Sequence, residues 1–192
     1  MFDAENQALW DIGTSAAIGP NLSFILRSNI ANAMNFRIGL FNIQPRLYRE
    51  AADDIDAGKL RVVIRKFDSD VGAEYSRAYR HLRVSNLAFG YNIEDMGYAF
   101  HETTHYITDL IYHSYSVPNS LNEAAAYIAE QTCHQYFGID ESWSWLDDTS
   151  LLKWAATIAK SVIKKPGYIV PAAHEKKLRD AILTNKHYAG KG

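Results

Sequence analysis

The sequence predicts an α+β fold that is mainly helical, with a small antiparallel sheet packed beside a helix that carries two histidines and a following helix that carries a glutamate. The chain has 192 residues, of which 47% are hydrophobic, and this is enough for the core of one domain. Two short stretches favour strands, and several longer stretches have helical periodicity or helix-end signals. We expect a single domain over 1–192, with a core of about 58–140 and helical extensions over about 1–57 and 148–187.

The N-terminal half contains both predicted strands. The first forty residues have no clear period and are interpreted as helical. Pro45 suits the first turn of a helix and Gly58 suits its end, so a helix is expected over about 45–57. RVVIRKF (61–67) and HLRVSNLAF (81–89) are predicted to be strands, joined by an acidic, glycine-containing connector. We expect these two strands to pair with each other as the antiparallel sheet.

The C-terminal half is predicted to be helical. Asp95 is a reasonable N-cap for the helix with the histidines, and Gly138 suits the end of the next one. LLKWAATIAKSVIKK places its apolar residues on one stripe with lysines opposite, a pattern typical of a helix packed on a core. The predicted helices span 95 to about 112, 122 to about 137, 151–165 and 172 to about 184.

Composition restricts the classes of partner. Twenty Lys+Arg residues against 22 Asp+Glu give a formal charge of −2, and no aromatic-basic stripe is seen, so no nucleic-acid partner is expected. The apolar runs are too short for a membrane span, and the N-terminus lacks the pattern of a secretory signal. Cys133 is the single cysteine, so no internal disulfide forms, and it is expected in the core. Localisation stays open between the cytoplasm and export within a larger protein.

The stretch FHETTHYITDL (100–110) carries the strongest chemical signal. His101 and His105 are four residues apart, so on a helix both imidazoles lie on one face, one turn apart, with Glu102 beside the first. This spacing suits a divalent metal ion. A chance match occurs roughly once per hundred chains of this composition, and the alternative is a surface helix with two unlinked histidines.

A catalytic zinc site needs a third protein ligand, and Glu123 is the first candidate. It follows His105 by 18 residues on the next helix, and a short connection allows the two helices to pack antiparallel. Ser120 and Glu123 also match a capping box, in which Glu123 would only bond the helix N-terminus, whereas a helix opened by Pro118 would leave Glu123 one turn inside. Glu130, seven residues on and on a similar face, is the alternative ligand.

With the HExxH motif at 101–105 and the Asn122-Glu123 pair, the chain resembles the gluzincin zinc metallopeptidases over about residues 80–137. The resemblance implies a metallopeptidase-like domain with one zinc ion per chain, held by His101, His105 and Glu123. In the thermolysin-like version of the pattern an aspartate follows the ligand glutamate by four residues, and here that position is Tyr127. The partner of the first histidine is therefore missing, and Asp109 is considered as a substitute, against the alternative of an exposed helical aspartate.

The resemblance also implies a function. Glu102 would act as general base in the hydrolysis of a peptide bond by a metal-activated water, and residues 84–89 would supply the edge strand that aligns an extended peptide. Tyr127 is the first candidate for stabilising the oxyanion, and Tyr168, His174 and His187 are candidates further downstream. His113 and His134 are too far along their helices to reach the same ion.

Several alternatives remain open. The same ligands would suit a zinc-binding module without turnover, or a zinc amidase acting on a nonpeptide amide, and a structural helical domain would need no metal. By analogy alone, a small domain of this kind suits a proteolytic module of a bacterial toxin or effector. Its partners would then be a protein or peptide substrate and an inhibitor or immunity protein.

Overall fold

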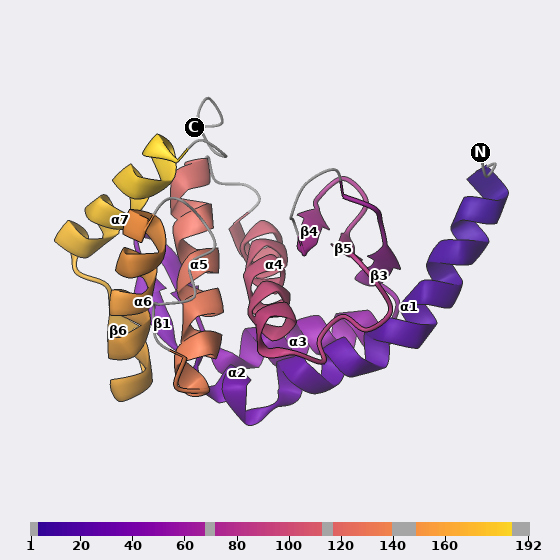
Figure 1. Ribbon diagram of the computed structural model, residues 1–192, viewed down its shortest axis with the longest axis horizontal. Helices are drawn as coiled ribbons and strands as arrows, with labels where there is room; N and C mark the ends of the chain where they lie inside the picture. The colour runs from indigo at the N-terminus through magenta and orange to yellow at the C-terminus, as the bar shows by residue number, and fades with distance from the viewer. Residues whose placement is uncertain (1–3, 68–71, 113–116, 140–148, 186–192) are drawn as a thin grey trace.

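The computed structural model describes residues 4–67, 72–112, 117–139 and 149–185 (Figure 1). These residues are mainly helical and include two small three-stranded sheets, so the predicted α+β class is confirmed. In chain order the elements are α1 (Ala4–Arg27), α2 (Asn29–Ala33), β1 (Phe36–Ile38), β2 (Phe41–Ile43), α3 (Pro45–Asp56), β3 (Arg61–Ile64), β4 (Ala73–Ser76), β5 (His81–Val84), α4 (Ile93–Tyr112), α5 (Asn119–Tyr136), α6 (Thr149–Lys164), β6 (Tyr168–Ile169) and α7 (Ala172–Thr184).

Helix α4 lies in the middle of the molecule (Figure 1). On one side it packs along α5, which in turn packs against α6 and α7. On the other side it contacts β4, and α1 and α3 also pack against it. Helix α4 therefore has neighbours on two sides, and only three of its residues, Glu94, Leu110 and Ile111, are exposed. Within the described ranges, no helix combines the length and the apolar character that crossing a membrane requires.

The sheet beside α4 is mixed, which corrects the expected antiparallel pairing of the two predicted strands. Its order is β3-β5-β4, with β5 parallel to β3 and antiparallel to β4. The segment interpreted as a connector contains β4, which turns back into β5 through a hairpin in which Arg80 has φ 50°. Because this hairpin reverses the chain, β5 returns in the direction of β3. The edge strand beside α4 is β4, and the prediction of an edge strand over 84–89 is wrong, since β5 ends at Val84.

A second sheet corrects the helical interpretation of both extensions. β1 and β2 form a hairpin whose residues alternate between buried and exposed, and β6 pairs in parallel with β1. Gly39 occupies the turn with φ +52°, a conformation that other residues rarely adopt. Residues 4–27 and 29–33 are helical as predicted, whereas residues 36–38 and 41–43 are strands.

The starts of the two central helices also differ from the expectation. α4 begins at Ile93, and the side chain of Asn92, not that of Asp95, accepts the N–H of the first turn, from Asp95 at 2.8 Å. α5 begins at Asn119 after Pro118. Ser120 therefore lies inside the helix, where its hydroxyl accepts a hydrogen bond from Arg179. The capping-box alternative is wrong, because the helix starts before Ser120.

Polar contacts fix the rotation of α4 on its α3 side. Tyr48 of α3 is fully buried, and its hydroxyl lies 2.7 Å from Oγ1 of Thr104, which donates to the carbonyl of Phe100. Tyr106 donates to Asp54 at 2.7 Å. Because residues 104 and 106 face α3, the face that carries residues 101 and 105 turns toward α5.

Candidate metal centre

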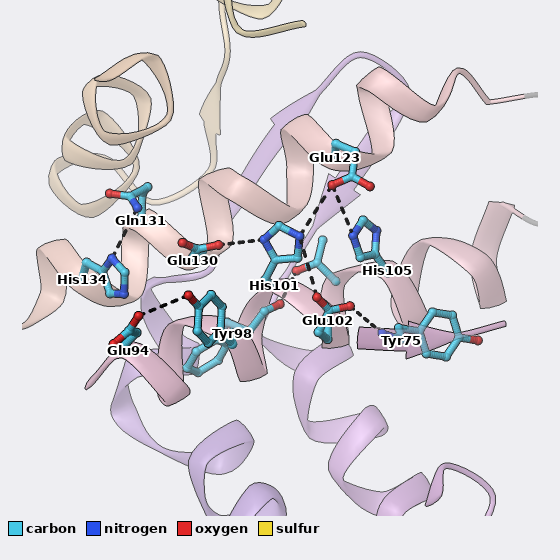
Figure 2. A network of polar contacts seen from close by, with 12 residues as sticks. Tyr75, Glu94, Tyr98, His101, Glu102, His105, Glu123, Glu130, Gln131 and His134 are labelled. Carbon is cyan, nitrogen blue, oxygen red and sulfur yellow. Dashed lines mark hydrogen bonds and ion pairs between the residues drawn. The ribbon is translucent and has the colours of Figure 1, made fainter. Parts of the chain in front are cut away.

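His101 and His105 lie on the face of α4 that meets α5 (Figure 2). The centroids of the two imidazole rings are 5.0 Å apart, as expected for residues one turn apart. His101 is buried, with 6% of its surface exposed. The neighbouring residues Phe100 and Ile107 are also buried, so the rotation that buries the core residues of α4 also brings the histidines to the interface.

Glu123 reaches both histidines from α5. His105 contacts Glu123, while His101 contacts both Glu123 and Glu130. The later histidine on α4 is therefore beside the earlier glutamate on α5, so the two helices are antiparallel, as predicted. The ligand atoms of His101, His105 and Glu123 all lie within 4.8 Å of one another. These three residues form a group able to hold a metal ion, which is the group that the sequence predicts.

The distances fit an ion between these side chains better than direct hydrogen bonds. Oε2 of Glu123 lies 3.6 Å from Nε2 of His101 and 3.6 Å from Nε2 of His105. A hydrogen bond from nitrogen to oxygen is normally shorter, and this buried oxygen has no hydrogen-bond partner. Two ligand atoms that each lie about 2.1 Å from a tetrahedral ion are about 3.4 Å apart. The unpartnered oxygen and its two equal distances therefore suit a shared metal ion.

The charges around the site favour a cation. Glu102, Glu123 and Glu130 all lie beside His101, and Glu123 also lies beside His105. None of the ion pairs in the described ranges brings a lysine or arginine to these glutamates. Buried carboxylates without a counter-charge are unfavourable. A divalent ion would compensate most of this charge, which gives a second reason why these residues fit a metal.

The pKa values of the ligand residues show the same coupling. Burial alone would lower the pKa of His101, but the Glu123 and Glu130 carboxylates outweigh it and hold this pKa well above its ordinary value. The pKa of His105 is also raised, since Glu123 outweighs burial there too. Burial alone would raise the pKa of Glu123, yet the two histidines keep it well below its ordinary value. Without a metal ion, protons on the imidazoles take the place of the positive charge.

Glu130 has a different role from the ligand role considered for it. Its Oε2 lies 2.8 Å from Nδ1 of His101 and not beside Nε2. Because a carboxylate only accepts, Nδ1 carries a proton, so the neutral, metal-binding form of His101 has its lone pair on Nε2, which faces Glu123. Glu130 therefore orients the first histidine. In the thermolysin-like pattern that the sequence resembles, this role belongs to an aspartate at the position that is Tyr127 here. The ring of Tyr127 packs edge-on against His101, with centroids 4.7 Å apart and an angle of 89°.

Glu102 lies at the edge of the group, with its side chain 13% exposed. Oε1 is 4.0 Å from Nε2 of His101, too far for a hydrogen bond, and Oε2 accepts the backbone N–H of Tyr75 at 2.6 Å (Figure 2). Burial raises the pKa of Glu102, and this outweighs the lowering by the histidines and the Tyr75 N–H. Glu102 is thus placed beside the ligands without being one of them, as the sequence predicts.

Asp109 is not exposed, and its carboxylate bonds Tyr75 and Arg77 and not an imidazole, which corrects both interpretations of it. Its side chain is 15% exposed, accepts the hydroxyl of Tyr75 at 2.9 Å and pairs with Nε of Arg77 at 2.6 Å. Tyr75 was missed by sequence reasoning. It lies in the unrecognised strand β4, 26 residues before His101, and no spacing rule marks such a residue.

The other histidines and tyrosines that the sequence analysis considered are not part of the metal-binding group in the described residues. His134 bonds Gln131 and is not part of the metal-binding group. His174 packs against the ring of Trp154, and Tyr168 lies in β6. Cys133 is buried as expected, and burial raises its pKa to about 12. His113 and His187 lie outside the described residues.

Comparisons with protein-family models, with curated proteins and with solved structures found no match to this chain. The functional interpretation therefore depends on the residues and geometry of the site.

Proposed function

We propose that this chain is a zinc-dependent endopeptidase in which His101, His105 and Glu123 hold one zinc ion per chain and Glu102 acts as general base. The observation that carries the proposal is the pair of 3.6 Å distances from the buried, unpartnered oxygen of Glu123 to both imidazoles, with Glu102 beside them. Two histidines and one glutamate are a ligand set typical of catalytic zinc. When bound there, zinc lowers the pKa of a water ligand to near 7 and polarises a carbonyl oxygen.

The residues around the ion would do the proton transfer. Glu102 lies beside the ligands without being one of them, which is the position that a general base needs. Glu102 takes a proton from the attacking water and passes it to the leaving amine. Tyr127, whose ring packs against His101, is proposed to donate a hydrogen bond to the developing oxyanion, and Tyr127→Phe then lowers kcat.

The sheet supports a peptide as the substrate. β4 is an edge strand that contacts α4, so one of its backbone edges faces the helix that carries the motif. An extended peptide can pair with such an edge through main-chain hydrogen bonds. An edge strand beside the metal-binding group favours an extended peptide over a compact nonpeptide amide, and since Glu102 already uses the Tyr75 N–H, the peptide would pair with other backbone groups of β4.

The test combines metal content with turnover. Elemental analysis of protein purified without a metal-affinity step should give about one zinc per chain, lost in His101→Ala and Glu123→Ala and kept in Glu102→Gln. With a mixture of unstructured peptides as substrate, Glu102→Gln should lower kcat by about 10² to 10⁴-fold.

The outcomes separate the alternatives. A native chain that takes up no zinc even when zinc is added would refute the metal site. Stoichiometric zinc without Glu102-dependent cleavage would refute the peptidase and favour a zinc-binding module without turnover.

A further inference from the structure

The two carboxylate oxygens of Glu102 have different surroundings (Figure 2). Oε2 accepts the N–H of Tyr75 at 2.6 Å, while Oε1 lies on the side of His101, 4.0 Å from its Nε2. The partner of Oε2 belongs to β4 and not to α4, which carries Glu102 itself. The orientation of the general base therefore depends on where β4 lies along α4.

Asp109 connects β4 to α4 a second time. It follows Glu102 by seven residues, so both side chains project from a similar face of α4, two turns apart. Its Oδ2 accepts the hydroxyl of Tyr75 at 2.9 Å, and its Oδ1 pairs with Nε of Arg77 at 2.6 Å. Tyr75 is thus held at two points of α4, through its backbone by Glu102 and through its side chain by Asp109.

This second connection matters because β4 is weakly held otherwise. The strand has four residues and pairs with β5 on one side only. The ring of Tyr75 also contacts the ring of Tyr106 edge-on, with centroids 5.7 Å apart, but such a contact fixes position less sharply than a hydrogen bond to a carboxylate. A shift of about 1 Å in β4 would be enough to lose a short hydrogen bond to Glu102.

We infer that Asp109 and Tyr75 are positioning residues for the general base. Asp109 holds the hydroxyl of Tyr75, which fixes β4 along α4. The Tyr75 N–H then holds Oε2 of Glu102, so that Oε1 faces the space beside His101 and the other ligands. This inference deepens the proposed function and rests on it for its catalytic consequence, whereas the contact itself exists with or without turnover.

The experiment removes the side-chain connection and keeps the backbone N–H. Tyr75→Phe and Asp109→Ala both break the hydrogen bond, and Asp109→Asn keeps an acceptor for the hydroxyl. Tyr106→Phe is the matched control, because it also removes a hydroxyl bonded to an aspartate, Asp54. The readouts are kcat and KM on peptides, zinc content, and the amide resonance of residue 75 in ¹⁵N-labelled protein, recorded with and without added zinc.

Tyr75→Phe and Asp109→Ala should each lower kcat by about 10 to 100-fold with KM changed less than about twofold and zinc content unchanged. Asp109→Asn should restore most of the rate. The double variant should be no slower than Asp109→Ala alone, because the contact that Tyr75→Phe removes is already lost there. The amide resonance of residue 75 should shift in Glu102→Gln, Tyr75→Phe and Asp109→Ala, and should stay in place in Tyr106→Phe.

Three results would overturn the inference. One is a kcat for Tyr75→Phe equal to that of the Tyr106→Phe control, another is independent, multiplying losses in the double variant, and the third is an unmoved amide resonance in Asp109→Ala. A native chain without turnover refutes the proposed function, and in that case the amide resonance alone decides whether Asp109 holds β4 against Glu102.

Discussion

Substitutions of Glu130 test how much the orientation of His101 contributes to zinc binding, because they leave the three proposed zinc ligands in place. It accepts the Nδ1–H of His101 at 2.8 Å, and both residues are buried. Glu130→Ala leaves this N–H without its partner and allows the imidazole to rotate. Glu130→Gln keeps an acceptor oxygen of similar reach and removes only the charge. The two variants therefore separate the contribution of the hydrogen bond from that of the charge.

The size of the effect follows from the kind of bond. A hydrogen bond to a charged group contributes about 1.5–3 kcal/mol, and each 1.4 kcal/mol corresponds to about tenfold in affinity. We expect the Kd for zinc to rise about 10 to 100-fold in Glu130→Ala, a range typical of such partners of metal ligands. Glu130→Gln should lose about three- to tenfold, because a neutral hydrogen bond remains.

The pH dependence of this loss has a definite sign. Glu130 is one of the groups that raise the pKa of His101 in the metal-free protein, so its removal lowers that pKa. A proton then competes less with zinc for His101. The loss of affinity should therefore be smallest at acid pH and grow as the pH rises.

The assay is competition for zinc against a coloured chelator at several pH values between about 6 and 9. Glu94→Gln is the matched control, because Glu94 also lies on α4 and accepts a hydrogen bond, from Tyr98 at 3.2 Å, but is exposed. A Kd for Glu130→Ala within about threefold of the native value would refute the reasoning. A complete loss of zinc would instead identify Glu130 as a ligand.

Three further predictions concern the ligands and the helix interface. Glu123→Ala should abolish stoichiometric zinc binding, measured by elemental analysis, since it removes the only carboxylate oxygen that the described structure places near both Nε2 atoms. In protein stripped of metal, the pKa values of His101 and His105 are raised on folding. The stability that this contributes is fully present below about pH 6.5 and is lost as the pH rises through the folded-state pKa values. The Tm of the metal-free protein should therefore fall above neutral pH, while the Tm of the zinc-loaded protein should not. Gly97→Ala should lower the free energy of unfolding by about 2 kcal/mol and the Tm by about 4–8 °C. The reason is that the added Cβ would lie 2.5 Å from Nε2 of His134, where α4 and α5 meet. An unchanged thermal melt would contradict this close packing.

Local signals in the sequence predicted the helices better than the sheets. Pro45 opens α3, the apolar stripe of 151–165 corresponds to α6, and the segment after Pro171 forms α7. β4 was missed because its four residues, AEYS, contain no β-branched residue and make a strand only through pairing with β5. The parallel pairing of β3 with β5 was missed for a similar reason, since direction depends on the hairpin between them and not on the composition of either strand.

The sequence by itself determined the part of the site that depends on one helix. His101, Glu102 and His105 are close together on α4 because helical geometry sets the positions of residues four apart, whatever surrounds the helix. The choice between Glu123 and Glu130 needed the tertiary structure. They are seven residues apart on α5, and His101 lies between them with Nε2 toward one and Nδ1 toward the other, so the register of α4 against α5 decides their roles. The contact between Tyr75 and Glu102 likewise exists only because an edge strand 27 residues away in sequence is packed on α4.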